Sequence, residues 1–319
     1  MAKQRLSLPK TLGILAAMLG TPSCQSSPKP AETPPSVKAD IVKPEPFPAK
    51  AGEKTSTAFD VTLSAKQAAD GTIIYVGLHP LMEIDIAGVK VVFEGKDFPV
   101  FPNGPAKDLG SIVVIPFNSK PRMSKIGLAW RGGNVDLPIE VIDGNYPTEK
   151  LTVAGDKVNP PKKVVKRIMR EQKEVSALYK KIVNERYWSG PFSLPIESEV
   201  TSRFGNKRLF NGKMASFHQG LDLRARTPLP IRAPEGAKVV LAKDLWFTGN
   251  TVILDHGYGL FTIYAHLSKL EVKVGDRVTK GQEMGLSGMT GRASGPHLHW
   301  GAVLMREKFN PADLTRVLR

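Results

Sequence analysis

Short runs of alternating apolar and polar residues, separated by turn-forming pairs such as Asp70-Gly71 and Asn103-Gly104, constrain the fold of this chain more than any other feature. Between about Ala58 and Val153 these runs are 59–63, 73–78, 84–93, 112–117, 126–130 and 137–142. A period of two is typical of strands, and several short strands at this spacing are typical of an antiparallel sandwich. We therefore expect a mainly β protein in which residues 55–155 form an immunoglobulin-like β-sandwich, an accessory domain without a catalytic constellation.

The chain is strand-rich again from about Pro191 to its end. Residues 251–255, 261–264 and 297–303 alternate, glycine and proline are frequent, and a helical period is confined to 311–318. This pattern predicts a second, antiparallel β domain over residues 190–319.

An amphipathic segment separates the two predicted β regions. Apolar residues recur at three- and four-residue steps, namely Val164, Val165, Ile168, Met169, Val175, Leu178, Tyr179 and Ile182. We expect a linking α-helix within residues 159–185, with Asn159 as the N-cap and Pro160 in the first helical position. Its other face carries Lys162, Lys163, Lys166, Arg167, Arg170 and Lys173, and this face is either solvated or directed at an anionic surface.

The first 24 residues resemble an export signal. Lys3 and Arg5 precede a short apolar stretch at 11–20, and small residues follow up to Cys24. This arrangement predicts a secretory signal peptide over residues 1–24 and a protein exported to the periplasm or cell envelope. Cys24 stands where a lipoprotein signal places its lipidated residue, so lipid anchoring to a membrane and ordinary cleavage both remain open. As the sole cysteine, it excludes an intramolecular disulfide and a cysteine zinc cluster.

Charge and proline content suggest what surrounds the protein. Lys and Arg number 45 against 30 Asp and Glu, a net charge of +15, which favours a polyanionic neighbour. Residues 25–54 form a Pro-rich tether that would hold a domain away from a surface. Export and the lack of basic residues interleaved with aromatic ones argue against nucleic acid. No run of about 18 uncharged apolar residues is present, so we expect no permanent membrane-spanning helix.

Histidine marks the chemistry, because five of the six histidines lie between residues 218 and 299. His218 and Asp222 are four residues apart, and His297 and His299 are two apart, a strand-like spacing that points both imidazoles to one face. Zinc accepts imidazole and carboxylate ligands, and three protein ligands leave a position for water. The residues therefore predict a zinc site formed by His218, Asp222 and one of the paired histidines.

The ordered motifs from 202 to 300 resemble the lysostaphin-type (LytM-domain) zinc metallopeptidases, which are peptidoglycan endopeptidases. The resemblance covers roughly residues 190 to 315. Its motifs are S-R-F-G (202–205), H-Q-G-L-D (218–222), A-P-E-G (233–236), D-H-G-Y-G (255–259), Y-A-H-L-S (264–268), V-G-D-R-V-T-K-G-Q (274–282) and T-G-R-A-S-G-P-H-L-H-W (290–300).

The resemblance assigns a role to each of five residues. It implies that His218, Asp222 and His299 hold one Zn²⁺. It also implies that His266 and His297 are the catalytic, non-ligand histidines, which position or deprotonate the attacking water and stabilise the oxyanion.

One histidine lies outside this set. His256, in D-H-G-Y-G, is expected to be a turn or surface residue. The sequence also departs from the family at Ala225-Arg226, where glycine often precedes Thr-Pro, and the arginine would add charge beside the site.

The resemblance implies a zinc-dependent endopeptidase that hydrolyses peptide cross-links or stem peptides of bacterial peptidoglycan. A cross-link from D-Ala to a diamino acid and a glycine bridge both stay open. A non-catalytic wall-binding activator or scaffold of other cell-wall hydrolases is the alternative. A biotinyl or lipoyl carrier hairpin at 274–285 is disfavoured because no Met-Lys-Met occurs.

Overall fold

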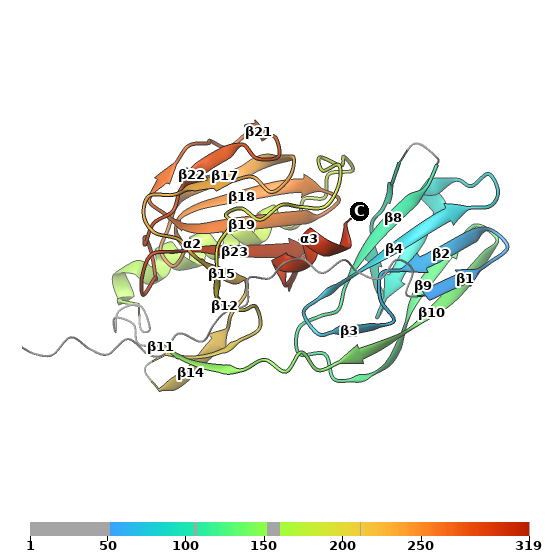
Figure 1. Cartoon of the computed structure of the whole chain (residues 1–319), viewed down its shortest axis with the longest axis horizontal. Helices are drawn as coiled ribbons and strands as arrows, with labels where there is room; N and C mark the ends of the chain where they lie inside the picture. Colours follow the sequence, from blue (N-terminus) through green and yellow to red (C-terminus); the bar gives the residue numbers. More distant parts are fainter. Residues whose placement is uncertain (1–51, 105–106, 152–159, 211, 319) are drawn as a thin grey trace, which may run out of the picture. The chain divides into compact units, whose positions relative to one another are not determined.

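The computed structural model describes residues 52–104, 107–151, 160–210 and 212–318 (Figure 1). The predicted signal peptide, Cys24 and most of the predicted tether lie outside the described residues. The strand β1 (Gly52–Thr55) takes in the last three residues of the predicted tether. No helix in the described ranges is long and apolar enough to cross a lipid bilayer.

Two sheets occupy the N-terminal part of the described chain, with the strand orders β1-β2-β4-β8-β7 and β3-β10-β9-β5-β6. The first contains β1, β2 (Phe59–Leu63), β4 (Ile73–Pro80), β7 (Val100–Pro102) and β8 (Leu109–Val114). The second contains β3 (Gln67–Ala69), β5 (Lys90–Phe93), β6 (Lys96–Phe98), β9 (Arg122–Trp130) and β10 (Gly133–Ile142), with a 3-10 turn at Ile86–Gly88. Neighbouring strands pair antiparallel except β3 and β10, which are parallel.

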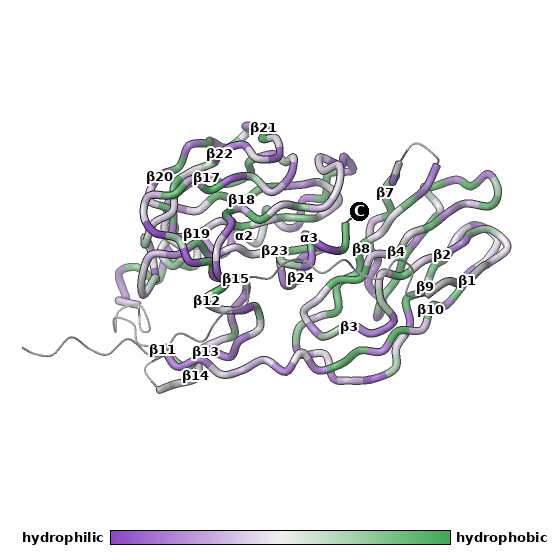
Figure 2. The backbone as a smooth tube through the Cα atoms, viewed as in Figure 1, coloured by the Kyte–Doolittle hydropathy of each residue, from purple (hydrophilic) through white to green (hydrophobic). Residues whose placement is uncertain are grey.

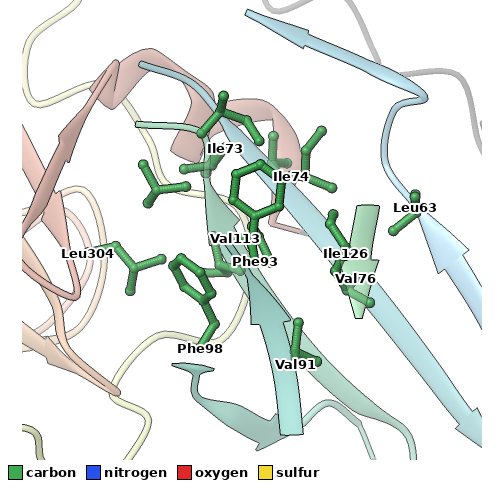
Figure 3. Close-up of a cluster of buried hydrophobic side chains, with 14 of the residues drawn as sticks. Leu63, Ile73, Ile74, Val76, Val91, Phe93, Phe98, Val113, Ile126 and Leu304 are labelled. Atoms are coloured by element: carbon green, nitrogen blue, oxygen red, sulfur yellow. The ribbon is translucent and has the colours of Figure 1, made fainter. Parts of the chain in front are cut away.

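The alternating sequence pattern explains how these two sheets bury their side chains. In β2 the apolar residues Phe59, Val61 and Leu63 are buried and the residues between them are partly exposed. All of β8 is buried, and Figure 2 shows hydrophobic residues along it. Buried side chains from both sheets, including Val113 and Ile126, belong to one cluster (Figure 3). Each such side chain stabilises the fold by about 1.5–3 kcal/mol.

The C-terminal part contains a sheet with the order β12-β15-β23-β19-β18-β17-β21, and β24 pairs with β23. Its strands are β12 (Val200–Ser202), β15 (Leu221–Arg224), β17 (Ala237–Leu245), β18 (Gly249–Gly257), β19 (Leu260–Leu267), β21 (Arg277–Val278), β23 (His297–Leu304) and β24 (Glu307–Phe309). A short sheet, β16-β22-β20, comprises β16 (Pro230–Arg232), β20 (Lys269–Leu270) and β22 (Glu283–Leu286). The mainly β character is therefore confirmed, whereas the immunoglobulin-like class of the N-terminal sheets stays a prediction.

A third small sheet, β11-β13-β14, joins segments distant in sequence. Its strands are β11 (Thr148–Leu151), β13 (Lys207–Phe210) and β14 (Lys213–Phe217), and β11 pairs with β13 in parallel. The chain ends with a 3-10 turn (Pro311–Asp313) and α3 (Leu314–Val317), within the predicted helical stretch.

The helix α2 (Lys162–Leu178) is shorter than the predicted 159–185. Asn159 lies outside the described residues; the N-cap is Pro161, which makes no side-chain capping bond, so Pro160 is not the first helical residue. The predicted apolar face is also partly wrong, because Met169 is 64% exposed whereas Glu171 is buried. The Glu171 carboxylate accepts hydrogen bonds from the Trp246 backbone N–H at 2.8 Å and from Arg167 Nε at 2.5 Å, which offsets the cost of burial.

Apolar side chains of the C-terminal sheet and of the N-terminal sheets share one buried cluster. Leu304 of β23 belongs to this cluster together with Phe98 and Val113, and Figure 3 labels all three. Trp188 packs edge-on against Phe101, with ring centroids 5.3 Å apart. The C-terminal sheet is therefore stabilised in part by side chains from outside it.

Candidate metal centre

Strand register brings the predicted site residues to the middle of the C-terminal sheet. In the antiparallel pairing of β15 and β23, Asp222 lies opposite His299 and Arg224 lies opposite His297. On the other side of β23, Ala265 of β19 lies opposite His299, which places His266 next to it. The period of two then gives His297 and His299 the same face.

Three donor atoms converge beside β15. His218 Nε2 is 2.9 Å and His299 Nδ1 is 2.8 Å from Asp222 Oδ1, and the two nitrogens are 3.0 Å apart. In the described part of the chain this trio is the group of His, Cys, Asp and Glu side chains close enough to hold a metal ion. The predicted ligands are thus brought together, and of the paired histidines it is His299 that joins Asp222 and His218.

Hydrogen bonds orient His218 for coordination. Its Nδ1 lies 2.9 Å from the backbone oxygen of Arg203, which can only accept, so Nδ1 carries the proton. Nε2 is left with a lone pair directed at the other two donor atoms. A neutral imidazole that binds metal through one ring nitrogen and donates the N–H of the other to a carbonyl is the usual arrangement of a metal ligand. Two imidazole nitrogens and one carboxylate oxygen suit zinc.

His266 and His297 flank the trio without joining it. Their ring centroids are 4.7 Å apart, and His297 Nε2 is 3.8 Å from Asp222 Oδ1. His266 Nδ1 donates to the Thr290 carbonyl and His297 Nδ1 to the Gly295 carbonyl, both at 2.8 Å. Each therefore keeps an unprotonated Nε2 that can accept a proton.

The backbone of His266 is strained. Its φ of +64° is in the left-handed region, which is uncommon for a residue with a side chain. The His266 N–H donates to the Thr248 carbonyl at 2.8 Å, which holds the residue in place. Such strain concentrates at functional sites, and here it sets the direction of the imidazole.

Burial controls the charge of the site. It lowers the pKa of His266 to about 3, aided by the neighbouring His297 and His299, and that of His299 to about 4. Burial by itself would raise the pKa of Asp222, but its close contacts with His218 and His299 hold it well below its usual range. At neutral pH the site therefore offers a carboxylate together with neutral His266 and His299 imidazoles, the forms that bind metals or accept protons.

The site opens into a groove of about 1,070 Å³. All five predicted residues line it, as do Ile168 and Val175 of α2 and Tyr179, which follows this helix. Its basic lining residues are Lys96, Arg208, Arg224, Arg292, Arg306 and Lys308. Its acidic lining residues are Glu149, Glu171, Asp222 and Glu307. A groove of this size can hold a peptide.

The expectation that His256 is a turn or surface residue is wrong. This side chain is fully buried near the end of β18. Its Nδ1 bonds the Gly236 carbonyl at 2.8 Å, its Nε2 bonds Thr262 Oγ1 at 2.7 Å, and burial lowers its pKa to about 4. It is a structural histidine, and the turn begins only after Gly257.

Sequence reasoning missed the residues that support the ligands. Arg208 donates to Asp222 Oδ2 at 2.6 Å, and Ser202 Oγ is 3.0 Å from His218 Nδ1. Ser202 belongs to the S-R-F-G motif, which could have drawn attention to it, whereas Arg208 has no distinguishing local signal.

Comparison with known proteins agrees with this geometry. Residues 216–311 match the family model of peptidase family M23. The peptidoglycan DD-endopeptidase ShyA of Vibrio cholerae is 36% identical over 119 residues, which are 36% of this chain and 28% of ShyA. The catalytic domain of lysostaphin from Staphylococcus simulans is 32% identical over 37% of this chain and 92% of that domain, with a TM-score of 0.34.

The match to the family model identifies residues 216–311 as a peptidase M23 domain. A peptidase M23 structure from Pseudomonas aeruginosa is 28% identical, with a TM-score of 0.61, and covers 78% of this chain and 95% of that one. Its likeness therefore extends well beyond residues 216–311. The chain spans about a quarter to a third of the length of the first curated relatives it matches.

Proposed function

We propose that this protein is a zinc-dependent endopeptidase that hydrolyses peptide bonds in the cross-links or stem peptides of peptidoglycan. The observation that carries the proposal is the convergence of His218, Asp222 and His299 on one point, with His266 and His297 beside it in the groove. The match to peptidase M23 and the peptidoglycan endopeptidases among the relatives support the reaction and the substrate class.

His218 Nε2, Asp222 Oδ1 and His299 Nδ1 would hold the zinc. Bound there, zinc would polarise the scissile carbonyl and lower the pKa of a water molecule. His266 Nε2 and His297 Nε2 can take up the proton of the attacking water, because both Nδ1 atoms already donate to carbonyls. Once protonated, either imidazole can donate to the oxyanion or to the leaving amine.

The basic residues of the groove would orient the substrate. Stem peptides carry carboxylates, and the groove is lined by Arg224 of β15, Lys308 of β24 and Arg292 of the loop before β23. Charge-assisted hydrogen bonds to these groups would fix the register of the peptide relative to the zinc.

Intact peptidoglycan sacculi test the proposal. We expect the purified protein to release fragments from them, loss of release with a zinc chelator, and recovery when zinc is restored. His299→Ala is the matched inactive control, because it removes one ligand. Mass spectrometry of the fragments identifies the bond. Binding to sacculi without any release would instead support the non-catalytic activator or scaffold.

We also propose that the protein acts in the periplasm or cell envelope, where this substrate lies. Residues 1–24 would direct export, and lipidation of Cys24 would anchor the protein to a membrane. Mass spectrometry of the mature N-terminus tests both steps. A mature chain that still begins at Met1 would contradict export, and an unmodified Cys24 or its loss by cleavage would contradict anchoring.

A further inference from the structure

We propose that Glu149, on β11, is a positioning residue for the metal centre and acts through Arg208 and Ser202 on Asp222 and His218. In the parallel pairing of β11 and β13, Glu149 lies directly opposite Arg208. Both residues lie outside the segment 216–311 that matches the peptidase model. The inference rests on the proposed zinc site and adds to it a residue from a distant strand.

The Glu149 carboxylate is held by three side-chain donors. Its Oε1 accepts from Asn206 Nδ2 at 2.5 Å, and its Oε2 accepts from Ser202 Oγ at 2.9 Å and from Arg208 Nε at 3.4 Å. The Glu149 side chain is 22% exposed and that of Arg208 17% exposed, so solvent screens this network only in part. An ion pair with several hydrogen bonds and little solvent fixes its members more firmly than a surface pair does.

Two branches of the network reach metal ligands. Arg208 donates a guanidinium N–H to Asp222 Oδ2 at 2.6 Å, the carboxylate oxygen that does not face the two histidines. Ser202 Oγ is 3.0 Å from His218 Nδ1 and accepts from Arg208 at 3.0 Å. Two of the three ligands are therefore oriented by partners that Glu149 holds.

The negative charge of Glu149 also favours metal binding, in addition to its effect on the orientation of the ligands. The guanidinium of Arg208 lies beside a carboxylate that must attract a divalent cation, and it opposes that attraction. The negative charge of Glu149 offsets it. Arg208 can thus position Asp222 without leaving an uncompensated positive charge next to the metal.

Zinc affinity of the metal-free full chain, measured by competition with a chromophoric chelator, tests this directly. We expect Glu149→Gln to raise the zinc Kd about tenfold, the low end of the usual 10–100-fold effect of losing a direct partner of a ligand, because Glu149 acts through such a partner. Glu174→Gln is the matched control, because Glu174 also pairs with a cation, Lys243 at 2.8 Å, but on α2. Absence of zinc binding by the wild type would overturn the zinc site. An unchanged Kd in Glu149→Gln would overturn only the role of Glu149.

A double-variant cycle tests the route. If Glu149 acts mainly through Arg208, Glu149→Gln should change the Kd less than about twofold in an Arg208→Gln background. An undiminished change of about tenfold in that background would overturn the route through Arg208. If Glu149→Gln does not fold, Arg208→Lys is the variant to test. It keeps the positive charge but loses the planar guanidinium that bonds Glu149 and Asp222 at the same time. It should raise the Kd about tenfold, and an unchanged Kd would overturn the proposal.

Discussion

Asp313 makes the stability of this protein depend on pH, through a carboxylate that is 2% exposed. Its Oδ2 accepts from the Ile73 backbone N–H of β4 at 3.2 Å, and its Oδ1 pairs with Arg316. Burial raises the pKa of Asp313 from 3.8 to about 6, although Arg316 lowers it, and Tyr146 is close enough to feel its charge. The folded protein therefore binds this proton more tightly than the unfolded chain does.

The sign and size of the effect follow. The contribution of Asp313 to the free energy of unfolding is largest below pH 3.8, falls as the pH rises through about 6, and is constant above. The whole change is about 3 kcal/mol, at 1.36 kcal/mol for each tenfold difference in proton affinity. Asp313→Asn removes it, so the stability of the variant relative to the wild type should rise by about that amount between pH 4 and pH 7.

Urea unfolding followed by tryptophan fluorescence measures this difference. A chelator in every sample keeps metal binding out of the comparison. Loss of the Arg316 pairing in Asp313→Asn changes the free energy of unfolding by an amount that is the same at every pH in this range. The test is therefore how the difference between the two proteins changes with pH. Asp97→Asn, which removes an exposed carboxylate 3.6 Å from Lys90, controls for net charge. A wild-type and Asp313→Asn difference that stays constant from pH 4 to pH 7 would refute the reasoning.

The remaining predictions concern the site and its packing. His266→Ala and His297→Ala should keep zinc, measured by chelator competition, but lose about 10²–10³-fold in kcat; near-wild-type turnover in both would contradict their role. Gly257→Ala should lose at least about 2 kcal/mol in urea unfolding, because φ is +88° and the new Cβ would meet a backbone carbonyl. Gly275→Ala, with φ +99° and open space, should lose less, and equal losses would exclude the steric cause. Leu304→Ala should lose about 2–5 kcal/mol in the same assay without changing the zinc Kd.

The strand content and the grouping of the site residues could be predicted because both depend on local patterns. Alternation fixes which face of a strand is buried, and the two-residue spacing of His297 and His299 gives them one face. A single pairing of β15 with β23 then brings Asp222 to His299.

Other features could not be predicted because they depend on distant partners. Glu149 and Arg208 are 59 residues apart and meet through a parallel pairing that no local pattern encodes. His256 is followed by turn-forming residues, but Gly236 and Thr262 satisfy both its nitrogens in the interior. The helix begins only at Lys162, because Pro161 has a ψ of 143°, outside the helical range, and is the N-cap.

The apolar cluster that the C-terminal sheet shares with the N-terminal sheets has a consequence for recombination. Leu260, Leu304 and Phe309 are buried in that cluster with side chains such as Phe101. A graft of residues 216–311 onto another scaffold would carry these side chains without the residues that bury them. The exposed apolar surface would promote aggregation. The peptidase portion of this chain therefore cannot be exchanged between proteins by itself. The residues that bury its apolar side chains must be transferred with it.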